Sequence, residues 1–423
     1  MSVLDALTSD FFQITLFNNF AARHIIGSFS FLEKTMWLLP FVKASILQQQ
    51  LMNKVTVKFK RNDQSEFYQE LHSRVNQYFS ERQISKYANG KMVFKTVFML
   101  ALYFVPFALL LSGIAQTFAS TMLLWVLMGL GMSGIGLSVM HDANHGAYSS
   151  NKRINDAVGF VLNFVGGYHI NWRIQHNVLH HSYTNIHGYD EDIEHQIFRF
   201  SPDEAFDRKY RFQAFYAPFL YGLMTIFWVV YKDFNQLYRY SKRGLLKGQG
   251  LTYRQALTHV LIYKILYVLA TLVLPLFILE LPVWQILVGF FTMHFICGLI
   301  LAFIFQPAHV LEDTNFYVPD ENGSIENNWA VHQLMTTANF ANKSRAFSWF
   351  VGGLNYQIEH HLFPHICHVH YRNLSPIVKA TAKEYNIPYY EHDTFISALA
   401  SHFKMLHDLG TGQYDARVQS AMG

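Results

Sequence analysis

Thr96–Met140, TVFMLALYFVPFALLLSGIAQTFASTMLLWVLMGLGMSGIGLSVM, decides the fold of this chain, because no charged residue occurs in it for 45 positions. A helix needs about 20 apolar residues to cross a bilayer, so the stretch is long enough for two crossings. The segment Gly113–Thr121 is the natural place for the chain to turn between them. The sequence therefore predicts a transmembrane hairpin with spans at about 96–115 and 121–140.

Three further apolar stretches follow, at about 213–231, 256–279 and 283–306. The last two are joined only by Glu280–Pro282, which allows a tight turn and nothing longer, so both are predicted to span the membrane in antiparallel fashion. The stretch at 213–231 is rich in aromatic residues, which suit the headgroup level of a bilayer. We expect it to lie in the interface or to re-enter, because an even number of crossings keeps the chain's histidine clusters on one face.

The composition favours a membrane protein over other classes. Of the 423 residues, 51% are hydrophobic and only 15% are charged, which does not suit two or three soluble domains. The net charge of +4 is small, and no basic stretch is interleaved with exposed aromatic residues. Nucleic acid is therefore not an expected partner, whereas the lipid bilayer is. Cys297 and Cys367 form no CxxC pair, which is neutral to mildly cytosolic evidence.

The placement of positive charge orients the predicted spans. Positive residues collect in cytoplasmic loops, and the two loops on the face opposite the histidines contain no lysine or arginine. We therefore expect four spans, with both termini and the active site on the cytosolic side of a bacterial inner membrane or the endoplasmic reticulum. The residues on the histidine-bearing face are Lys91, Lys95, Lys152, Arg153, Arg173, Lys232, Arg239, Lys242, Arg243, Lys247, Arg254, Lys343 and Arg345.

Four segments are expected along the chain. Residues 1–54 form an N-terminal extension of uncertain role, and residues 55–93 form a cytosolic helical segment. The membrane domain covers residues 94–390, and residues 391–423 form a cytosolic C-terminal tail. Because Met52 directly precedes the polar helical segment, residues 1–51 are hypothesised to be a dispensable extension or an upstream misread start.

The chain carries 22 histidines, and three clusters of them hold the predicted chemistry. The first, HDANH at 141–145, directly follows the second span, and continued helix would place both imidazoles on one face. The second, HNVLHH at 176–181, places its first two histidines on one face and the third about 100° away. The third, QIEHH at 357–361, offers an amide oxygen in place of an imidazole. His309 follows the last span by a few residues and completes the set.

These clusters predict a centre with two metal ions. Imidazole suits iron, zinc, copper and nickel, so the ligand type does not name the metal, but eight histidines and a glutamine exceed the capacity of one ion. The Glu-x-x-His motif of soluble di-iron bundles and the His-Glu-x-x-His motif of hydrolytic zinc sites are both absent from the sequence. An oxidative centre is the best remaining explanation. Four nearby acids could orient its imidazoles: Asp142, Asp190, Glu191 and Asp192. They could equally belong to a solvated loop.

The three boxes, together with the segments HHSYTNIHGYDED and HHLFPHICHVHY, resemble the membrane fatty acid desaturase family and especially its front-end branch. The resemblance covers roughly residues 60–390. It implies an all-α integral membrane fold of four transmembrane helices in two hairpins, with a cytosolic helical cap that carries a di-iron centre. It also implies that the protein uses dioxygen and two electrons to place a cis double bond in a fatty acyl chain.

Carried over position by position, the resemblance implies ligands for two iron ions (Fe2+/Fe3+) and no catalytic residue beyond this metal centre. Gln357 stands where other branches have a histidine and points to front-end chemistry, in which the new bond lies between an existing one and the carboxyl end. Whether Gln357 binds iron directly stays open. His365, His368 and His370 are expected to be structural. The implied ligand set is His141, His145, His176, His180, His181, His309, Gln357, His360 and His361.

The resemblance also implies partners. Many front-end enzymes carry a fused cytochrome b5 domain, but its His-Pro-Gly-Gly motif does not occur in this sequence. Electrons are therefore expected from a separate ferredoxin or cytochrome b5, for which the basic cytosolic face offers a docking surface. The acyl substrate is expected in a narrow apolar tunnel, linked to coenzyme A, a carrier protein or a phospholipid.

Three other functions remain open from the sequence. A membrane di-iron fatty acyl or alkyl hydroxylase would use similar histidine boxes and the same oxidant. A metal transporter would need ionisable residues inside the spans, where only His259, Lys264 and His294 occur. A structural membrane protein with fortuitous histidines would tolerate alanine at His180.

Overall fold

In the part of the chain that the structure describes, four helical runs are long and apolar enough to cross a membrane. Each consists of one helix or of consecutive helices without a break. The runs are α4 (Gly90–Leu111); α5 (Phe118–Gly134) with η1 (Ile135–Val139) and α6 (Met140–Asn144); α13 (Tyr253–Val268) with η7 (Leu269–Val273) and α14 (Leu274–Ile278); and α15 (Val283–His309).

The first run begins earlier than the predicted residue 96. The Asn89 side chain caps α4 by accepting hydrogen bonds from the backbone N–H groups of Lys91 and Met92. The first turns therefore contain Lys91 and Lys95, two charged residues that a search for apolar stretches leaves out. The fourth run ends later than predicted and includes His309 in its last turn.

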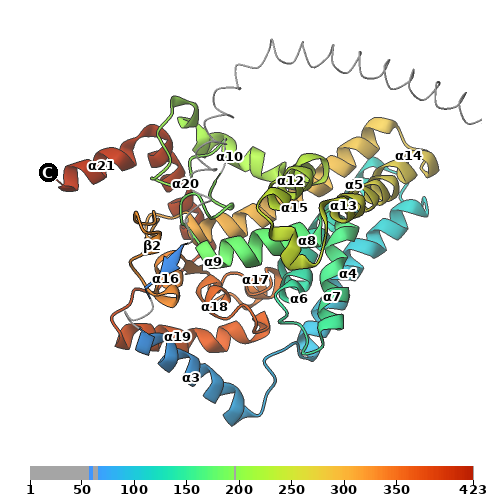
Figure 1. The fold of residues 1–423 in the computed structure, drawn as a ribbon. Coiled ribbons are helices and arrows are strands. Elements are labelled where there is room, and N and C mark those ends of the chain that lie inside the picture. Colours follow the sequence, from blue (N-terminus) through green and yellow to red (C-terminus); the bar gives the residue numbers. More distant parts are fainter. Residues whose placement is uncertain (1–56, 61–64, 195–196, 423) are drawn as a thin grey trace, which may run out of the picture. The chain divides into compact units, whose positions relative to one another are not determined.

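The structure is a computed structural model that describes residues 57–60, 65–194 and 197–422. The predicted extension at 1–54 lies outside these residues, as does the hypothesis about residues 1–51. From Val57 onward the chain forms one compact, mostly helical unit (Figure 1). Its described strands form two short parallel pairs, in which β1 (Lys58–Phe59) pairs with β2 (Ser324–Ile325) and β3 (Ala338–Phe340) pairs with β4 (Tyr390–His392).

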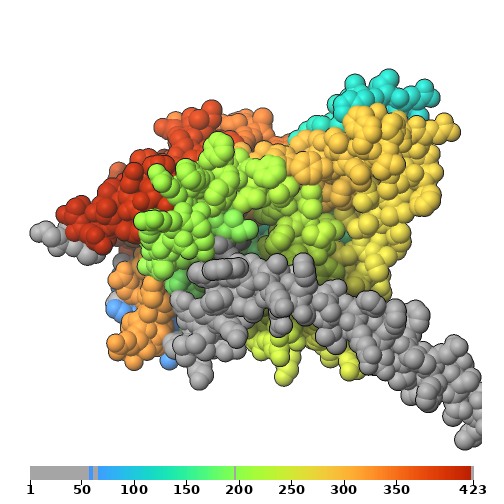
Figure 2. Space-filling model, turned by 90° about the horizontal axis from the view of Figure 1, so that it is seen from above, coloured from blue at the N-terminus to red at the C-terminus, as the bar shows by residue number. Residues whose placement is uncertain are grey.

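The α5 run and α15 lie side by side and point in the same direction. Phe118 and Trp284, near their first residues, have ring centroids 5.5 Å apart, whereas His141 and Phe305, near their last turns, have ring centroids 6.4 Å apart. Both hairpin turns therefore lie at the same end of the bundle, as Figure 2 shows for the cyan and yellow segments. The histidines that end both runs lie at the opposite end.

The stretch predicted to lie in the interface forms a bent pair of helices. α10 (Gln213–Gly222) is followed by a continuous run of α11 (Met224–Phe227), η5 (Trp228–Lys232) and α12 (Asp233–Lys242), and the two parts are bent by 60°. Large apolar side chains on this pair are exposed, among them Phe215 at 89% and Val230 at 65%. The bend distinguishes the pair from the four runs above, which continue without a break.

A helical cap covers the end of the bundle that carries the histidines (Figure 1). Phe67 and Leu71 of α3 pack there with Leu374 and Val378 of α19 in one buried cluster. Part of the predicted tail also packs against the bundle, because Leu406 of α20 is buried among residues of α10 and α15. The helices of the cap and tail are α3 (Ser65–Arg82), α16 (Trp329–Met335), α17 (Arg345–Phe350), α18 (Gln357–Leu362), α19 (Tyr371–Glu384), α20 (Phe395–Thr411) and α21 (Gln413–Met422).

Short helices between the second and third runs carry the second histidine cluster and the adjoining loops. They are α7 (Lys152–Phe160), η2 (Val161–Val165), α8 (His169–Trp172), η3 (Arg173–His180) and α9 (His181–Tyr183). Three further short turns are η4 (Arg208–Tyr210), η6 (Leu245–Gln249) and η8 (His368–His370). The second cluster therefore belongs to the segment that joins the second run to the bent pair.

Candidate metal centre

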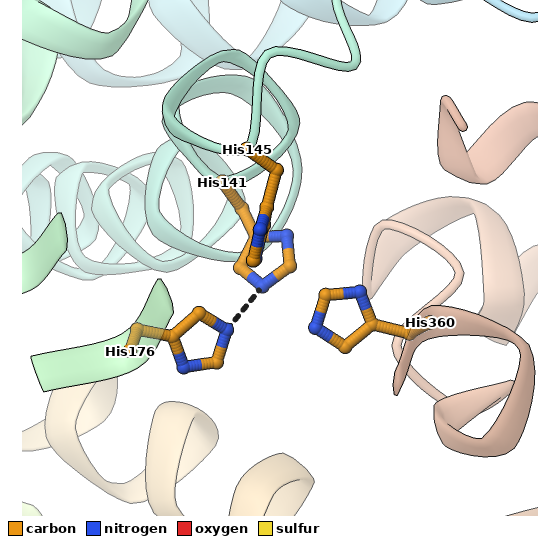
Figure 3. A group of neighbouring side chains, drawn as sticks. All are labelled: His141, His145, His176 and His360. Carbon is orange, nitrogen blue, oxygen red and sulfur yellow. Dashed lines mark hydrogen bonds between the residues drawn. The ribbon is translucent and has the colours of Figure 1, made fainter. Parts of the chain in front are cut away.

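The three predicted histidine clusters meet in one buried place. In Figure 3 the rings of His141, His145, His176 and His360 point toward one another from three separate segments. Their ligand nitrogens all lie within 4.8 Å of one another. His145 is partly exposed and the other three rings are buried. This set is called group one.

A second set of histidines lies next to the first. The ligand nitrogens of His180, His309 and His361 also lie within 4.8 Å of one another, and all three residues are buried. These residues form group two. His181 joins the groups, because its Nε2 lies 3.2 Å from Nε2 of His176 and 3.0 Å from Nε2 of His360, while its ring stacks 4.3 Å from that of His361.

The second cluster is wound differently from the prediction. The sequence predicted that His181 points about 100° away from the face that His176 and His180 share, as it would in an α-helix. Arg173–His180 is instead a π-helix, whose backbone bonds join residues five apart. The wider turn brings residues 176 and 181 onto one face. All three histidines of the cluster therefore face the same buried region, with His176 in group one, His180 in group two and His181 between them.

Group two has the hydrogen bonding of metal ligands. Nδ1 of His180 lies 3.1 Å from the Asp190 carboxylate, Nδ1 of His361 lies 2.8 Å from Oε1 of Gln333, and Nδ1 of His309 lies 3.2 Å from the Thr336 carbonyl oxygen. Each acceptor fixes the proton on Nδ1 and leaves Nε2 with a free lone pair. All three Nε2 atoms are buried without a partner. Three convergent, orphaned lone pairs are what a bound cation requires.

Group one fits a metal by a different observation. Nε2 of His141 lies 3.2 Å from Nε2 of His176. The neighbour of Nε2 of His141 is thus another imidazole nitrogen and not an oxygen. Ring nitrogens bound to one ion at about 2.1 Å are separated by roughly 3 Å, so this spacing suits shared coordination. Nε2 of His145 is also buried without a partner. The chemistry of the donors therefore fits two ions, one in each group.

Burial keeps most of these rings neutral. It lowers the pKa of several imidazoles well below the usual value, and neighbouring imidazoles lower it further because two adjacent rings resist charging together. Outside the spanning runs, this holds for His176, His181, His360 and His361. For His180 burial also lowers the pKa, but Asp190 outweighs it and the net shift is upward. Neutral imidazoles offer the lone pairs that metals bind.

The predicted acids divide into two kinds. Asp190 contacts His180 directly, and Asp192 lies 3.5 Å from Nδ1 of the same ring. Asp142 lies 3.8 Å from Nδ1 of His141. Glu191 contacts none of the ligand histidines and instead accepts hydrogen bonds from Arg239, Arg243 and Tyr240. The loop is therefore built around the histidine site and is not merely solvated.

The three histidines expected to be structural lie outside both groups. His365 is exposed. His370 is buried, with Nε2 3.2 Å from the Tyr87 carbonyl oxygen. His368 is also buried, and its Nδ1 lies 2.8 Å from Asp142, the residue beside His141. His368 therefore reaches the site indirectly.

Gln357 lies on α18, three and four residues before His360 and His361, so it shares their face of the helix. Its side chain is fully buried, and neither amide atom has a partner among the described residues. A buried, unsatisfied amide is costly unless a ligand completes it. The position of Gln357 therefore suits an amide that contacts a bound metal ion or its ligands.

Sequence reasoning missed several residues that hold the ligands. Gln333 accepts from His361, and the Tyr371 hydroxyl lies 3.3 Å from Nδ1 of His360. Trp172 packs against His176, with ring centroids 4.5 Å apart. No spacing rule links Gln333 or Tyr371 to the boxes, because their contacts with the ligands join residues 28 and 11 positions apart. Only the position of Trp172, four residues before His176, carried a local signal.

Comparison with known proteins identifies the family. A model of the fatty acid desaturase family matches residues 118–393. The chain belongs to the fatty acid desaturase family. It is 36% identical to the sn-1 linoleoyl-lipid 6-desaturase of Synechocystis sp. over 348 residues, which cover 81% of this chain and 95% of that protein. It is 33% identical to the acyl-lipid (8-3)-desaturase of Physcomitrium patens over 367 residues, 85% of this chain and 75% of that protein.

Membership confirms several predictions. The chain is an all-α integral membrane protein and an oxidoreductase, an acyl desaturase of the front-end branch that acts on an acyl substrate with dioxygen. Its histidine groups could bind metal ions.

Proposed function

We propose that this desaturase holds two iron ions in the buried histidine groups and inserts a cis double bond on the carboxyl side of one already present in a lipid-linked acyl chain. His141, His145, His176 and His360 would hold one ion, and His180, His309 and His361 the other, with His181 between them. Gln357 would complete the set. The relatives support a lipid-linked chain, since one is named for a linoleoyl lipid and another for an acyl lipid.

One observation carries this proposal. Nε2 of His180, of His309 and of His361 are buried, unpartnered and convergent, while each Nδ1 faces an oxygen. A protein core rarely leaves three lone pairs unsatisfied together. All-imidazole ligation suits an iron centre that stays strongly cationic. When bound, the two ions would activate dioxygen to remove hydrogen from an unactivated carbon.

The chain's own residues would exclude water, orient the ligands and contact the acyl chain. Burial of the two groups would exclude bulk water and so limit side reactions of the oxidant with solvent. Asp190 and Gln333 hold two imidazoles in the orientation that aims Nε2 at the centre. Trp172 and Phe305 pack against His176 and give the site an apolar wall suited to a methylene chain.

The orientation we propose places the histidine end of the bundle and both termini on the cytosolic side. Supporting this, both spans that end in ligand histidines run toward the same end, and the basic loops adjoin it. Electrons would then arrive from a separate cytosolic carrier, a ferredoxin or cytochrome b5.

Metal content of the purified protein tests the proposal. The full chain, purified without chelator and loaded anaerobically with ferrous iron, is expected to hold two iron ions per chain by elemental analysis. The His361→Ala variant should lose about one ion, because only group two loses a ligand with a free Nε2. One ion in the parent chain, or zinc retained in place of iron with product still formed, would overturn the di-iron assignment.

A further inference from the structure

A basic surface lies on α12 and the turn that follows it. It consists of Arg239, Lys242, Arg243 and Lys247 and is called the α12 basic surface. Lys242 and Lys247 are exposed and the two arginines are partly exposed. No aspartate or glutamate occurs between residues 234 and 279 to neutralise them. Within the described part of the chain, the one carboxylate that pairs with this surface is that of Glu191.

Glu191 is buried beneath the two arginines. Its Oε2 accepts hydrogen bonds from Arg239 at 3.0 Å and from the Tyr240 hydroxyl at 2.8 Å, and its Oε1 accepts one from Arg243 at 3.3 Å. The surface therefore carries four positive charges against the one negative charge of Glu191, and its net charge is positive. The lysines have no ion-pair partner among the described residues, and their charge faces outward.

A short bonded route leads from this surface to a metal ligand. Glu191 is joined by one peptide bond to Asp190, whose carboxylate lies 3.1 Å from Nδ1 of His180. A second connection runs from Gln236 of α12, which donates to Gln175 at 2.7 Å, and Gln175 donates to Asp192. Helix α12 is therefore tied to the segment around the second histidine cluster both through the arginines on its surface and through the buried Gln236.

The reaction constrains what must dock. Dioxygen takes up four electrons to become two water molecules; two come from the two C–H bonds that are broken, and two must come from a donor, together with two protons. Ferredoxins and cytochrome b5 carry one electron each, so two donor molecules must bind and leave for each double bond. Such an encounter has to be brief, which favours a small, charged contact over an apolar one.

We propose that the α12 basic surface is the docking site of the electron donor, a small acidic redox protein, and that electrons enter the centre through Glu191, Asp190 and His180. This inference rests on the proposed function, since it assumes a reducible centre at His180. Opposite charge would steer the donor to the surface and would make its arrival sensitive to salt. The buried Glu191 would hold the two arginines in a fixed position under the docked protein.

The test reverses charge at residues outside the metal site. Lys242→Glu/Lys247→Glu is compared with a matched control, Lys91→Glu/Arg153→Glu, which reverses two other exposed cations that the proposed orientation also places on the cytosolic side. Each protein is placed in nanodiscs of phosphatidylcholine. Plant-type [2Fe–2S] ferredoxin is titrated in two assays, equilibrium binding by calorimetry and product formation from an acyl lipid.

We expect the α12 double variant to weaken ferredoxin binding, and to raise the ferredoxin concentration at half-maximal rate, by about tenfold or more. The control should stay close to the parent chain. Product formed in a single turnover with dithionite should be the same in all three proteins, because a small chemical reductant needs no docking site. Equal binding by all three proteins, or equal weakening in the control, would overturn the proposal.

A lipid role for the surface would give a different result. If the variant lost a stimulation by phosphatidylglycerol in the nanodisc while its ferredoxin dependence stayed unchanged, the surface would be a headgroup site and the docking proposal would be wrong. Absence of product with dithionite in the parent chain would instead contradict the proposed function. The calorimetric titration would still decide docking, because it requires no turnover.

Discussion

Both carboxylate oxygens of Asp190 lie 3.1 Å from Nδ1 of His180. A carboxylate can only accept here, so the ring proton sits on Nδ1 and Nε2 is left free to face His309 and His361. Asp190 also accepts from the backbone N–H groups of Asn185 and Asp192, which fix its position. One acid thus sets the direction in which a buried ligand points.

Removing this acceptor should weaken the metal centre. Asp190→Asn keeps the shape of the side chain but replaces one oxygen with a donor, so the imidazole loses its preferred tautomer. We expect ferrous iron to bind about 10–100-fold more weakly, measured by competition with a chelator. Glu321→Gln, at an exposed position, is the matched control. Unchanged affinity in Asp190→Asn would show that the contact does not orient His180.

Alanine substitution of two histidines near each other in sequence should affect activity differently. His360 is fully buried with Nε2 3.0 Å from Nε2 of His181, whereas His365 is exposed. We expect His360→Ala to form no detectable desaturated product and His365→Ala to keep its activity within about twofold. Chromatography of fatty acid methyl esters measures both, with equal membrane insertion checked by immunoblot. Similar losses in the two variants would contradict the ligand assignment.

A buried ion pair inside the membrane region should show strong coupling. Lys264 pairs with Asp233, and both are nearly excluded from solvent; Asp233 in turn accepts a hydrogen bond from Asn171, the residue before Trp172. We expect Lys264→Met to destabilise the protein by about 3–5 kcal/mol, because it leaves a buried carboxylate unpaired. The double variant Lys264→Met/Asp233→Asn should be more stable than Lys264→Met alone.

Thermal unfolding in detergent, followed by tryptophan fluorescence, measures this difference. Lys343→Met is the control, since Lys343 pairs with Asp393 on an exposed surface and its loss should not shift the transition. If the double variant melted below the single variant, the two side chains would contribute independently and the pair would not be coupled.

The pH dependence of stability should include a contribution from His402. Burial lowers the pKa of His402 to about 4; the ring lies between the Val310 carbonyl and the Tyr221 hydroxyl, each 2.9 Å away. The unfolded chain protonates this histidine near pH 6.5, so it binds more protons than the folded chain between pH 6.5 and 4. The contribution of His402 to stability is therefore complete above pH 6.5 and is lost as the pH falls toward 4.

Melting curves of the parent chain and His402→Gln check this sign. The stability of the parent chain relative to the variant should fall by at most about 1.4 kcal/mol for each pH unit below 6.5. A difference that stayed constant from pH 7 to pH 5 would mean that His402 does not stay neutral in the folded protein.

Hydropathy predicted the existence of the four spanning helices, and the two lysines in the first turns of α4 explain the error at its start. A run without charged residues is a strong signal because lipid tolerates few alternatives to an apolar helix. Lys91 and Lys95 lie inside α4 because the helix begins at its cap, outside the apolar stretch. The 60° bend after Gly222 had no equally clear signal, since both sides of it are apolar.

The histidine boxes could be found from spacing, but their geometry could not. The π-helix at Arg173–His180 changes which histidines share a face, and a sequence pattern of three to four residues per turn assumes an ordinary helix. Gln333 and Asp190 reach their ligands through long-range or loop contacts, which depend on the packed fold. His368, expected to be structural, contacts Asp142 within the first box, a contact that the spacing did not indicate.

The central claim, that the buried histidines support front-end desaturation, is tested most directly by the fatty acid profile of a host that expresses the chain beside its His180→Ala variant. Gas chromatography with mass spectrometry is expected to find a new double bond on the carboxyl side of an existing one with the parent chain, and none with the variant at equal membrane insertion. Hydroxylated chains without a new alkene, or the same new alkene from both proteins, would contradict the claim.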